Sequence, residues 1–514
     1  MFVITFGLLL IGAIFRLNDI NFGLPHSLYA DEPEIAEFAI KYTYELRNIV
    51  GNDKYYELIP VSFVYGTFPT YVFTIVTMFY SKFSNLLNIS FDKEDIYVFL
   101  RTTNALLTLA VIPLTALLYK SVFKKRMGIY ISLFLAALNW KLIVHAHYLN
   151  QDIILTLCLL GAYIAMVHYN NKQNDTLYTV VAGLLFGLAV GTKVTALLTL
   201  PVLLYLYFVK KDLKGAIAFV CLTYGAFILT NPFSVAFFDD FLFRVYTLSV
   251  KENGLVFDSV DSDVFKYVRA LFLITTPLVA LFSLFGIAKI LKRGIAKTNS
   301  THLFLLLHIV IYLVFYSTGS RRVDRWLLPI LPIMFVYAAY GISYSYSKLN
   351  KLWALMLTVL LLGSYLYFPM LLLVQFQRNT PKSASYIWAK DNLEPGANKY
   401  AVTEEGLDPL NKLQSTTVYH YKVYSNEGAS LSYPQDPLGY HYIIISSRPM
   451  TNFKRPEVKQ AYPNYVGRWE EFEQIITDPT KFELIKSFEL PKPNLVPLSD
   501  VLIYKNLNPI EPII

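Results

Sequence analysis

Residues 352–377 read LWALMLTVLLLGSYLYFPMLLLVQFQ, a stretch without a single Asp, Glu, Lys or Arg. A helix that crosses the hydrocarbon core of a bilayer needs about 20 mostly apolar residues, with a range of about 17–25. Only helices and closed barrels satisfy all their backbone hydrogen bonds inside lipid. The stretch therefore predicts a membrane-spanning helix, and the number of similar stretches decides the fold class.

Similar stretches occupy most of the chain before it. The run 1–15 lacks a basic start and a small-residue cleavage site, so we expect a retained anchor rather than a signal peptide. The sequence thus predicts a polytopic α-helical membrane protein with about 11 transmembrane helices. Besides 352–377, the expected spans are 1–15, 102–119, 127–144, 153–171, 176–192, 194–209, 215–238, 270–288, 298–320 and 326–347.

The composition excludes several other classes of protein. Hydrophobic residues make up 55% of the 514 residues and charged residues 16%, whereas soluble chains average about 25% charged. The two cysteines, Cys158 and Cys221, both lie inside apolar runs. A disordered chain, a disulfide scaffold and a zinc ribbon are therefore excluded.

Basic residues in the short connections predict the orientation and account for the net charge of +8. Alternate crossings place these residues on one side, which is the cytoplasm by the positive-inside rule. The N-terminus is then cytoplasmic, and everything after about residue 376 is extracytoplasmic. The residues concerned are Lys120, Lys124, Lys125, Arg126, Lys172, Lys210, Lys211, Lys214, Lys289, Lys292, Arg293, Lys297, Lys348 and Lys351.

The segment 63–80 decides where the preceding loop lies. If it crosses the membrane, the loop 20–62 is cytoplasmic; if it only dips in, that loop is outside. Gly66, Pro69 and many aromatic residues favour a re-entrant or juxtamembrane segment. We therefore expect the loop 20–62 on the outer side.

The composition changes near residue 376, where Pro, Asp, Glu and Lys become frequent. We expect a transmembrane module over 1–375, with outer loops 20–62 and 232–268, and a small extracytoplasmic α/β domain over 376–514. Residues 375–380 would connect the two. Apolar periodicity in the second part predicts a helix over 381–391 and strands over 399–403, 442–446 and 501–504.

The first outer loop carries two adjacent carboxylates, Asp31 and Glu32, directly before Pro33. Apolar residues from Ile35 to Ile49 recur at helical spacing, which predicts an amphipathic helix able to lie on the membrane surface. The carboxylates either cap this helix or act as a general base at the membrane boundary. Spacing alone leaves both alternatives open.

The stretch from His145 to Asp152 joins two predicted spans and contains a second candidate site. His145 and His147 match a metal pair only loosely, because residues two apart point in different directions on a helix. Asp152 either caps the next helix or is a second carboxylate that faces the first. No divalent metal is required by the sequence.

Two further segments carry basic residues that we expect on the outer side of the membrane. Lys193 follows Gly183, Gly187 and Gly191, whose spacing favours close helix packing. This lysine either snorkels to the surface or pairs with a lipid phosphate. Arg321, Arg322 and Arg325 oppose the positive-inside bias; pairing with Asp324 would account for one of them, and a guanidinium cluster suits phosphate binding.

Motifs for nucleotide-driven or hydrolytic chemistry are absent from the sequence. It contains no GxxxxGK[ST], no GxGxxG after a strand, no nucleophile elbow and no HExxH. ATP-driven transport by this chain is therefore not expected, and neither is nucleic-acid binding.

The order of several motifs resembles the phospholipid-carrier-dependent glycosyltransferases of the GT-C superfamily, which include protein O-mannosyltransferases and aminoarabinose transferases of lipid A. The resemblance covers nearly the whole chain. Trp326 departs from it, since Tyr is usual there, and the Arg321-Arg322 pair is not a family hallmark. The matching residues are Asp31-Glu32, Tyr65-Gly66-Thr67-Phe68-Pro69-Thr70-Tyr71, Arg101, Asp152, Gly187-Leu188-Ala189-Val190-Gly191-Thr192-Lys193, Asn231-Pro232, Arg325-Trp326-Leu327-Leu328-Pro329-Ile330-Leu331-Pro332 and Ser385–Gly396.

The resemblance implies transfer of a sugar from a polyprenyl- or dolichyl-phosphate carrier to an acceptor hydroxyl of a protein, lipid or glycan, on the outer face and with inversion. It implies that Asp31, with Glu32, supplies the general base. Lys193 and Arg325, with Arg321 or Arg322, would bind the donor phosphate. Asp152, Tyr65 and His147 would form a second carboxylate or the acceptor side.

Two other functions remain open at this point. A transporter or flippase for an anionic lipid-linked sugar would use the same outer arginines, but it predicts charges in the middle of spans, and few are found. A polytopic scaffold with a partner-binding outer domain is the third alternative. The expected location is the plasma membrane of a prokaryote.

Overall fold

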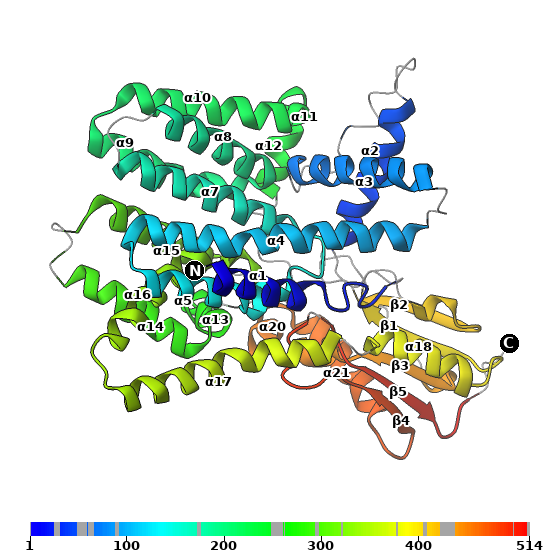
Figure 1. The fold of residues 1–514 in the computed structure, drawn as a ribbon. Helices are drawn as coiled ribbons and strands as arrows, with labels where there is room; N and C mark the ends of the chain where they lie inside the picture. The colour runs from blue at the N-terminus through cyan, green and yellow to red at the C-terminus, as the bar shows by residue number, and fades with distance from the viewer. Residues whose placement is uncertain are drawn as a thin grey trace.

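The structure is a computed structural model. It describes residues 2–24, 31–48, 59, 66–87, 92–171, 176–247, 261, 263–292, 294, 298–319, 322–376, 379–404, 409–421, 437–496 and 498–510. Long helices run side by side in one bundle, and a small sheet lies at one end of it (Figure 1). The connections α9–α10 and α16–α17 lie at the opposite end, so the predicted basic loops are separated from the sheet by the length of the bundle.

The bundle consists of apolar helices that follow the predicted spans in order. They are α1 (Phe2–Leu17), α4 (Lys93–Phe123), α5 (Arg126–Ala137), α6 (Trp140–Val144), α7 (Gln151–Asn171), α8 (Thr176–Thr192), η2 (Val194–Thr199), α9 (Leu200–Lys210), α10 (Leu213–Thr230), α13 (Lys266–Thr275), α14 (Pro277–Leu291), α15 (Ser300–Thr318), η6 (Asp324–Ile330), α16 (Leu331–Tyr346) and α17 (Lys351–Phe376).

Several of these helices have the length and composition of membrane spans. Among the described residues, 6 are long and apolar enough to cross a bilayer, and the pair α13–α14 would add a seventh if it forms one span. Four shorter apolar helices cover Val3–Leu17, Arg126–Ala137, Thr176–Thr192 and Val194–Lys210. The polytopic helical fold is confirmed, and the number of crossings stays a prediction.

Three predicted spans are broken, which corrects the sequence-based boundaries. The span predicted over 215–238 ends at Thr230, because Asn231 leaves the helical conformation and a separate short helix begins at Pro232. The span predicted over 270–288 bends by 107° between α13 and α14. Thr276 has a φ of 68°, and Pro277 cannot donate a helix hydrogen bond, so the helix restarts there. The span predicted over 127–144 divides at Asn139, whose side chain accepts a hydrogen bond from Leu142 N and begins α6.

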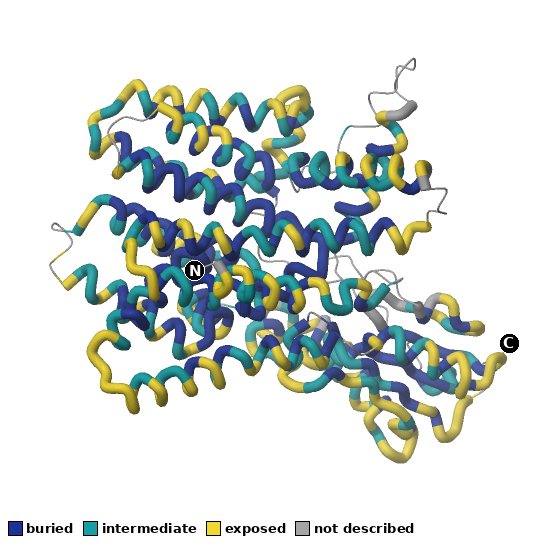
Figure 2. Tube along the Cα trace, viewed as in Figure 1, coloured by how far each residue is buried: buried dark blue, intermediate teal, exposed yellow. Residues whose placement is uncertain are grey.

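Burial separates central from peripheral helices (Figure 2). In the apolar stretch of α7, 83% of the residues are buried, and in that of η6 and α16 together, 89% are buried. In the apolar stretch of α10, only 22% of the residues are buried. Exposed apolar side chains such as Leu229 on α10 and Leu352 on α17 face outward. Such an apolar outer surface is stable only in contact with lipid, which agrees with an integral membrane protein.

The end of the bundle where the sheet lies carries four further helices, α2 (Asp31–Asn48), α3 (Phe68–Leu87), α11 (Pro232–Ala236) and α12 (Phe238–Tyr246). The apolar face of α2 packs on α3, where the rings of Tyr42 and Tyr71 lie 6.3 Å apart. This face, predicted to lie on the membrane, is therefore covered by protein. Residues 63–65 lie outside the described residues, and α3 is a helix of 20 residues beside α4.

The glycine repeat in α8 brings this helix against α10. A Cβ on Gly187 would lie 2.5 Å from the carbonyl oxygen of Thr223 and 2.6 Å from Cβ of Ala226. A Cβ on Gly191 would lie 2.4 Å from Oγ1 of Thr230. The predicted packing role of these glycines is confirmed, because only a residue without a side chain allows this approach.

Gly187→Ala is expected to destabilise the bundle by about 1–3 kcal/mol, because the added methyl group must push two backbones apart. Gly225→Ala is a matched control in the neighbouring α10, since its Cβ would meet nothing within 4 Å. Thermal unfolding of both variants in detergent checks this. Equal melting temperatures would contradict the close contact between α8 and α10.

The C-terminal part forms a mixed five-stranded sheet of order β2-β1-β3-β5-β4. β1 pairs in parallel with β2 and β3, and β5 is antiparallel to β3 and β4. The helix and three strands predicted here are confirmed, whereas β2, β4 and the later helices were not predicted. The elements are α18 (Pro381–Asn392), β1 (Lys399–Glu404), η7 (Pro409–Lys412), β2 (Thr416–Tyr421), η8 (Pro437–Gly439), β3 (Tyr442–Ser446), α19 (Ser447–Asn452), α20 (Pro456–Ala461), α21 (Pro463–Ile476), β4 (Phe482–Phe488) and β5 (Val501–Asn506).

A buried amide joins this sheet domain to the end of α17. Nε2 of Gln375 donates hydrogen bonds to the carbonyl oxygens of Pro491 and Pro493 at 2.6 and 2.9 Å. Its Oε1 accepts one from Leu495 N at 3.2 Å. Because Gln375 is fully buried, its three hydrogen bonds attach the sheet domain to the end of α17.

Candidate active site

Four charged side chains from four separate parts of the chain meet at the end of the bundle that carries α2. Asp31 begins α2, Asp152 lies in the first turn of α7, Lys193 follows α8, and Arg325 lies in η6. The sequence singled out each of these residues, but it left open which would meet.

Arg325 bridges the two carboxylates. Its Nη2 lies 2.6 Å from Oδ2 of Asp31, and its Nε lies 3.1 Å from Oδ2 of Asp152. Lys193 Nζ donates a hydrogen bond of 2.8 Å to the other oxygen of Asp152. We call Asp31, Asp152, Lys193 and Arg325 the charged cluster; its two cations balance its two carboxylates.

Exposure distinguishes the two carboxylates. The side chain of Asp152 is 1% exposed and both its oxygens contact a cation, whereas that of Asp31 is 15% exposed. A capping role for Asp152 is not favoured, because Asn150 already caps the start of α7: its Oδ1 accepts a hydrogen bond from Asp152 N. Asp31 is thus the carboxylate that an incoming group can reach.

Three sequence motifs meet to hold Lys193. Gly66 N donates to the carbonyl oxygen of Thr192 at 3.1 Å, and a Cβ on Gly66 would collide with the backbone of Gly191. Asn231 accepts a hydrogen bond from Thr67 N through Oδ1 and donates to the carbonyl oxygen of Gly191 through Nδ2. Hydrogen bonds from Gly66 and from Asn231 therefore hold the backbone directly before Lys193.

Aromatic side chains hold the segment that carries Arg325. The hydroxyl of Tyr267 accepts a hydrogen bond from Val323 N at 2.9 Å, and its ring stacks at 6.4 Å on Trp326. Nζ of Lys193 lies 5.5 Å from the centre of the Trp326 ring. The Trp that departs from the family pattern thus also packs beside a cluster cation.

Glu32 has a different environment from Asp31. It is fully buried and accepts two hydrogen bonds from Arg101, at 2.7 and 2.6 Å. Leu149 N donates to the same carboxylate at 3.2 Å, and Arg101 also donates to the carbonyl oxygen of Phe22. This geometry favours a structural role for Glu32, which ties the start of α2 to α4 and to the loop before α7.

Removing one partner of such a buried, hydrogen-bonded pair costs about 3–5 kcal/mol. The catalytic role predicted for Glu32 is not favoured by this geometry.

The two histidines do not point to a metal. The ring nitrogens of His147 lie 2.9 Å from the carbonyl oxygens of Ile143 and Asn18, and its ring stacks on Phe376 at 3.8 Å. Burial lowers the pKa of His147 to about 4, against the effect of the two carbonyls. Burial, with the charges of Lys141 and Arg325, lowers the pKa of His145 well below its usual value.

Across the residues that the structure describes, no group of three or more potential metal ligands occurs. The contacts of His147 also do not favour the acceptor-side role predicted for it.

The remaining predicted residues have separate outcomes. Arg322 pairs with Asp324, its Nε lying 2.9 Å from Oδ1, which is the pairing that the sequence allowed for one of the three arginines. This contact does not favour a phosphate-binding role for Arg322. Arg321 and Tyr65 lie outside the described residues.

Comparisons with known proteins give one family model and several solved structures that resemble this chain. The family model described as dolichyl-phosphate-mannose-protein mannosyltransferase matches residues 92–235. ArnT from Cupriavidus metallidurans bound to undecaprenyl phosphate has a similar structure, with a TM-score of 0.54 and 15% sequence identity over 98% of this chain and 97% of that chain. Part of the chain therefore matches a glycosyltransferase family model, and the whole chain shares its fold with ArnT.

A second similar structure is the archaeal oligosaccharyltransferase AglB from Archaeoglobus fulgidus in complex with an inhibitory peptide and a dolichol-phosphate. Its TM-score is 0.50 at 14% identity, over 78% of this chain and 62% of that chain. No curated protein sequence gives a significant match. The likeness to these two structures therefore concerns the fold.

The sequence did not indicate which residues support the candidate site. Arg101 was noted only as a family match, and Asn150 and Tyr267 were not noted at all. The signal available for Arg101 was a charge inside a long apolar helix, since such a charge needs a buried partner. Nothing in the spacing indicates that this partner is Glu32, 69 positions earlier.

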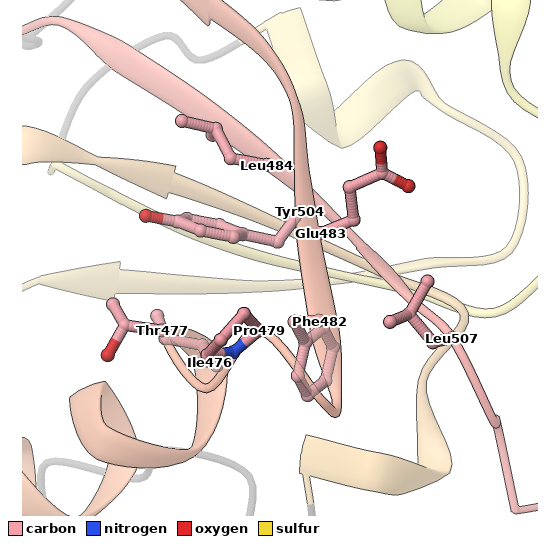
Figure 3. Close-up of a pocket in the computed structure, with 8 residues that line it drawn as sticks. All are labelled: Ile476, Thr477, Pro479, Phe482, Glu483, Leu484, Tyr504 and Leu507. Carbon is pink, nitrogen blue, oxygen red and sulfur yellow. The ribbon is translucent and has the colours of Figure 1, made fainter.

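A hollow of about 440 Å³ on the sheet domain is separate from the charged cluster. It lies between the end of α21 and the strands β4 and β5, and Figure 3 shows the rings of Phe482 and Tyr504 on its wall. No cluster residue lines it. The other lining residues are Ile476, Thr477, Pro479, Glu483, Leu484 and Leu507.

Proposed function

We propose that the protein transfers a sugar from a polyprenyl- or dolichyl-phosphate carrier to an acceptor hydroxyl, at the extracytoplasmic face and with inversion at the anomeric carbon. The observation that carries the proposal is the bridge from Arg325 to Asp31 and Asp152 beside Lys193. It combines a reachable carboxylate with two cations that suit a phosphate. The match to a mannosyltransferase family model supports it.

In the proposed reaction, the acceptor oxygen attacks the anomeric carbon while Asp31 takes the hydroxyl proton. The bond between that carbon and the phosphate oxygen breaks, and its electron pair stays on the phosphate. The guanidinium of Arg325 lies 2.6 Å from Oδ2 of Asp31 and holds this carboxylate in place. Lys193 and Arg325 would stabilise the departing phosphate.

The role of Asp152 would be to position these cations. Its oxygens contact Lys193 and Arg325, so both face the same small region. When Asp31 becomes protonated, Arg325 loses one of its two anionic partners and can interact more strongly with the phosphate. The carboxylate that takes the proton and the cation that receives the leaving group are thereby coupled.

The purified protein, supplied with a panel of polyprenyl-phosphate sugars, tests the proposal. We expect release of polyprenyl phosphate together with a glycoside whose anomeric configuration, read by NMR, is opposite to that of the donor. A product with retained configuration would exclude direct displacement by the acceptor. Consumption of no donor in the panel, with acceptor proteins, lipids and glycans present, would contradict the donor class.

The proposed orientation predicts where reporters fused to the chain will lie. A reporter after Tyr400, in β1, is expected outside the cytoplasm, and one at Lys211, between α9 and α10, inside it. Activity of a paired periplasmic and cytoplasmic reporter at each site checks this. Finding both fusions on one side would exclude the proposed topology, whatever the chemistry.

A further inference from the structure

Lys141 is a cation near the site that neither the motifs nor the charged cluster includes. It lies in α6 and is partly buried. Within the described part of the chain its ammonium forms no ion pair and donates no side-chain hydrogen bond; it lies 5.1 Å from the centre of the Trp140 ring. No direct ion pair offsets the cost of burying this charge, so an anion that binds beside it would be favoured.

The position of Lys141 is fixed by its neighbours. Asn139 donates to the carbonyl oxygen of Ile274 at 2.8 Å, and Trp140 Nε1 donates to that of Leu273 at 3.2 Å. The short helix α6 is thus attached to the end of α13. Lys141 cannot leave this place without breaking these contacts.

Lys141 and the charged cluster share electrostatic neighbours. The charge of Lys141 interacts with Asp324, Arg322 and Arg325 of the segment at η6. His145, one turn after Lys141, interacts with the charges of both Lys141 and Arg325. His145 also contacts Asn150, which caps the backbone at Asp152. The charges of Lys141 and Arg325 therefore act on the same neighbour, His145, which is linked through Asn150 to Asp152.

If the proposed function holds, the charge of Lys141 would balance the negative charge of the bound carrier phosphate. The donor is a phosphodiester with one negative charge. The four residues of the charged cluster have a net charge of zero, so the positive charge of Lys141 balances the negative charge of the bound donor. After transfer the phosphate is a monoester of about −1.5 to −2 charge. Protonation of Asp31 then leaves the cluster with one positive charge, and with Lys141 it again matches the ligand.

We propose that Lys141 is a further phosphate-binding residue, which contacts the carrier phosphate together with Lys193 and Arg325. This inference rests on the proposed function, because it assumes a lipid phosphate at the cluster. It predicts that loss of Lys141 weakens binding of the monoester product more than binding of the diester donor. The charge that Lys141 neutralises is larger in the product.

Binding of undecaprenyl phosphate to the purified full-length protein tests the role of Lys141. Lys141→Met keeps the chain length without the charge and is expected to weaken binding about ten- to hundredfold. Lys141→Arg should restore it to within a fewfold. Lys93→Met is the matched control, since Lys93 is an outer-end lysine whose side chain is 58% exposed and paired with Glu37; its affinity should not change.

Undecaprenol, which lacks the phosphate, separates effects on the lipid chain from effects on the charge, and its binding should be equal in all variants. Lys141→Gln serves as a second uncharged variant if Lys141→Met does not fold. Unchanged affinity in a folded uncharged variant, while the wild type binds the phosphate, would refute the role of Lys141 alone. If the wild type does not distinguish undecaprenyl phosphate from undecaprenol, the proposed function fails, and the Lys141 role with it.

Discussion

Asp31→Asn is expected to lower the rate of sugar transfer about 10²–10⁴-fold, because a general base contributes a factor of this size. Asparagine keeps the size of the side chain and can still accept a hydrogen bond at the start of α2, but it cannot take a proton. A lost helix cap costs only about 0.5–2 kcal/mol of stability. The measurement is the turnover number of the purified variant with a polyprenyl-phosphate sugar.

Donor affinity separates this prediction from a general loss of structure. Removing the negative charge of Asp31 leaves the cluster more positive, so the donor should bind at least as well as in the wild type while turnover falls. Asp239→Asn is the matched control, since Asp239 is an exposed aspartate in the first turn of α12. The turnover of this variant should be unchanged.

If Asp31→Asn keeps turnover within a fewfold of the wild type, Asp31 is a cap. The burial of Glu32 against Arg101 would then make Asp152 the next candidate for the base.

Arg325→Ala is expected to raise the donor concentration needed for half-maximal rate about ten- to hundredfold, because a charge-assisted contact to a phosphate contributes about 1.5–3 kcal/mol. The change also removes the cation that Asp31 and Asp152 share. The two carboxylates would then give the site an excess negative charge, which repels the donor phosphate. Donor titration of the initial rate measures the effect.

Two further substitutions test whether the charge or the shape of each cation matters for donor use. Arg325→Lys keeps the charge but has no planar fork to reach two carboxylates, so an intermediate loss is expected. Lys193→Ala should weaken donor use as well, with Asp152 still held by Arg325. Arg269→Ala is the control, because Arg269 is 55% exposed and pairs with Asp263 at the same end of the bundle. Donor use unchanged in both Arg325→Ala and Lys193→Ala would assign these cations to structure.

The sequence by itself determined the class of the fold and the order of its helices. Apolar stretches such as 352–377 are local signals, because each residue contributes its own transfer free energy to the span. The strands at 399–403, 442–446 and 501–504 were predictable for a similar reason, since they are short apolar runs between turn residues. Sequence order and residue type also singled out Asp31, Asp152, Lys193 and Arg325, through motifs that resemble a known family.

Only the tertiary structure decided which charges meet. Asp31 and Glu32 are adjacent, yet one reaches Arg325 at an accessible site and the other is buried against Arg101. The break at Thr276 and the place of Lys141 beside η6 also depend on neighbours from distant segments. The physical reason is that an ion pair forms between opposite charges that the packing of the helices brings within a few ångströms of each other. The local sequence around each charge does not indicate that distance.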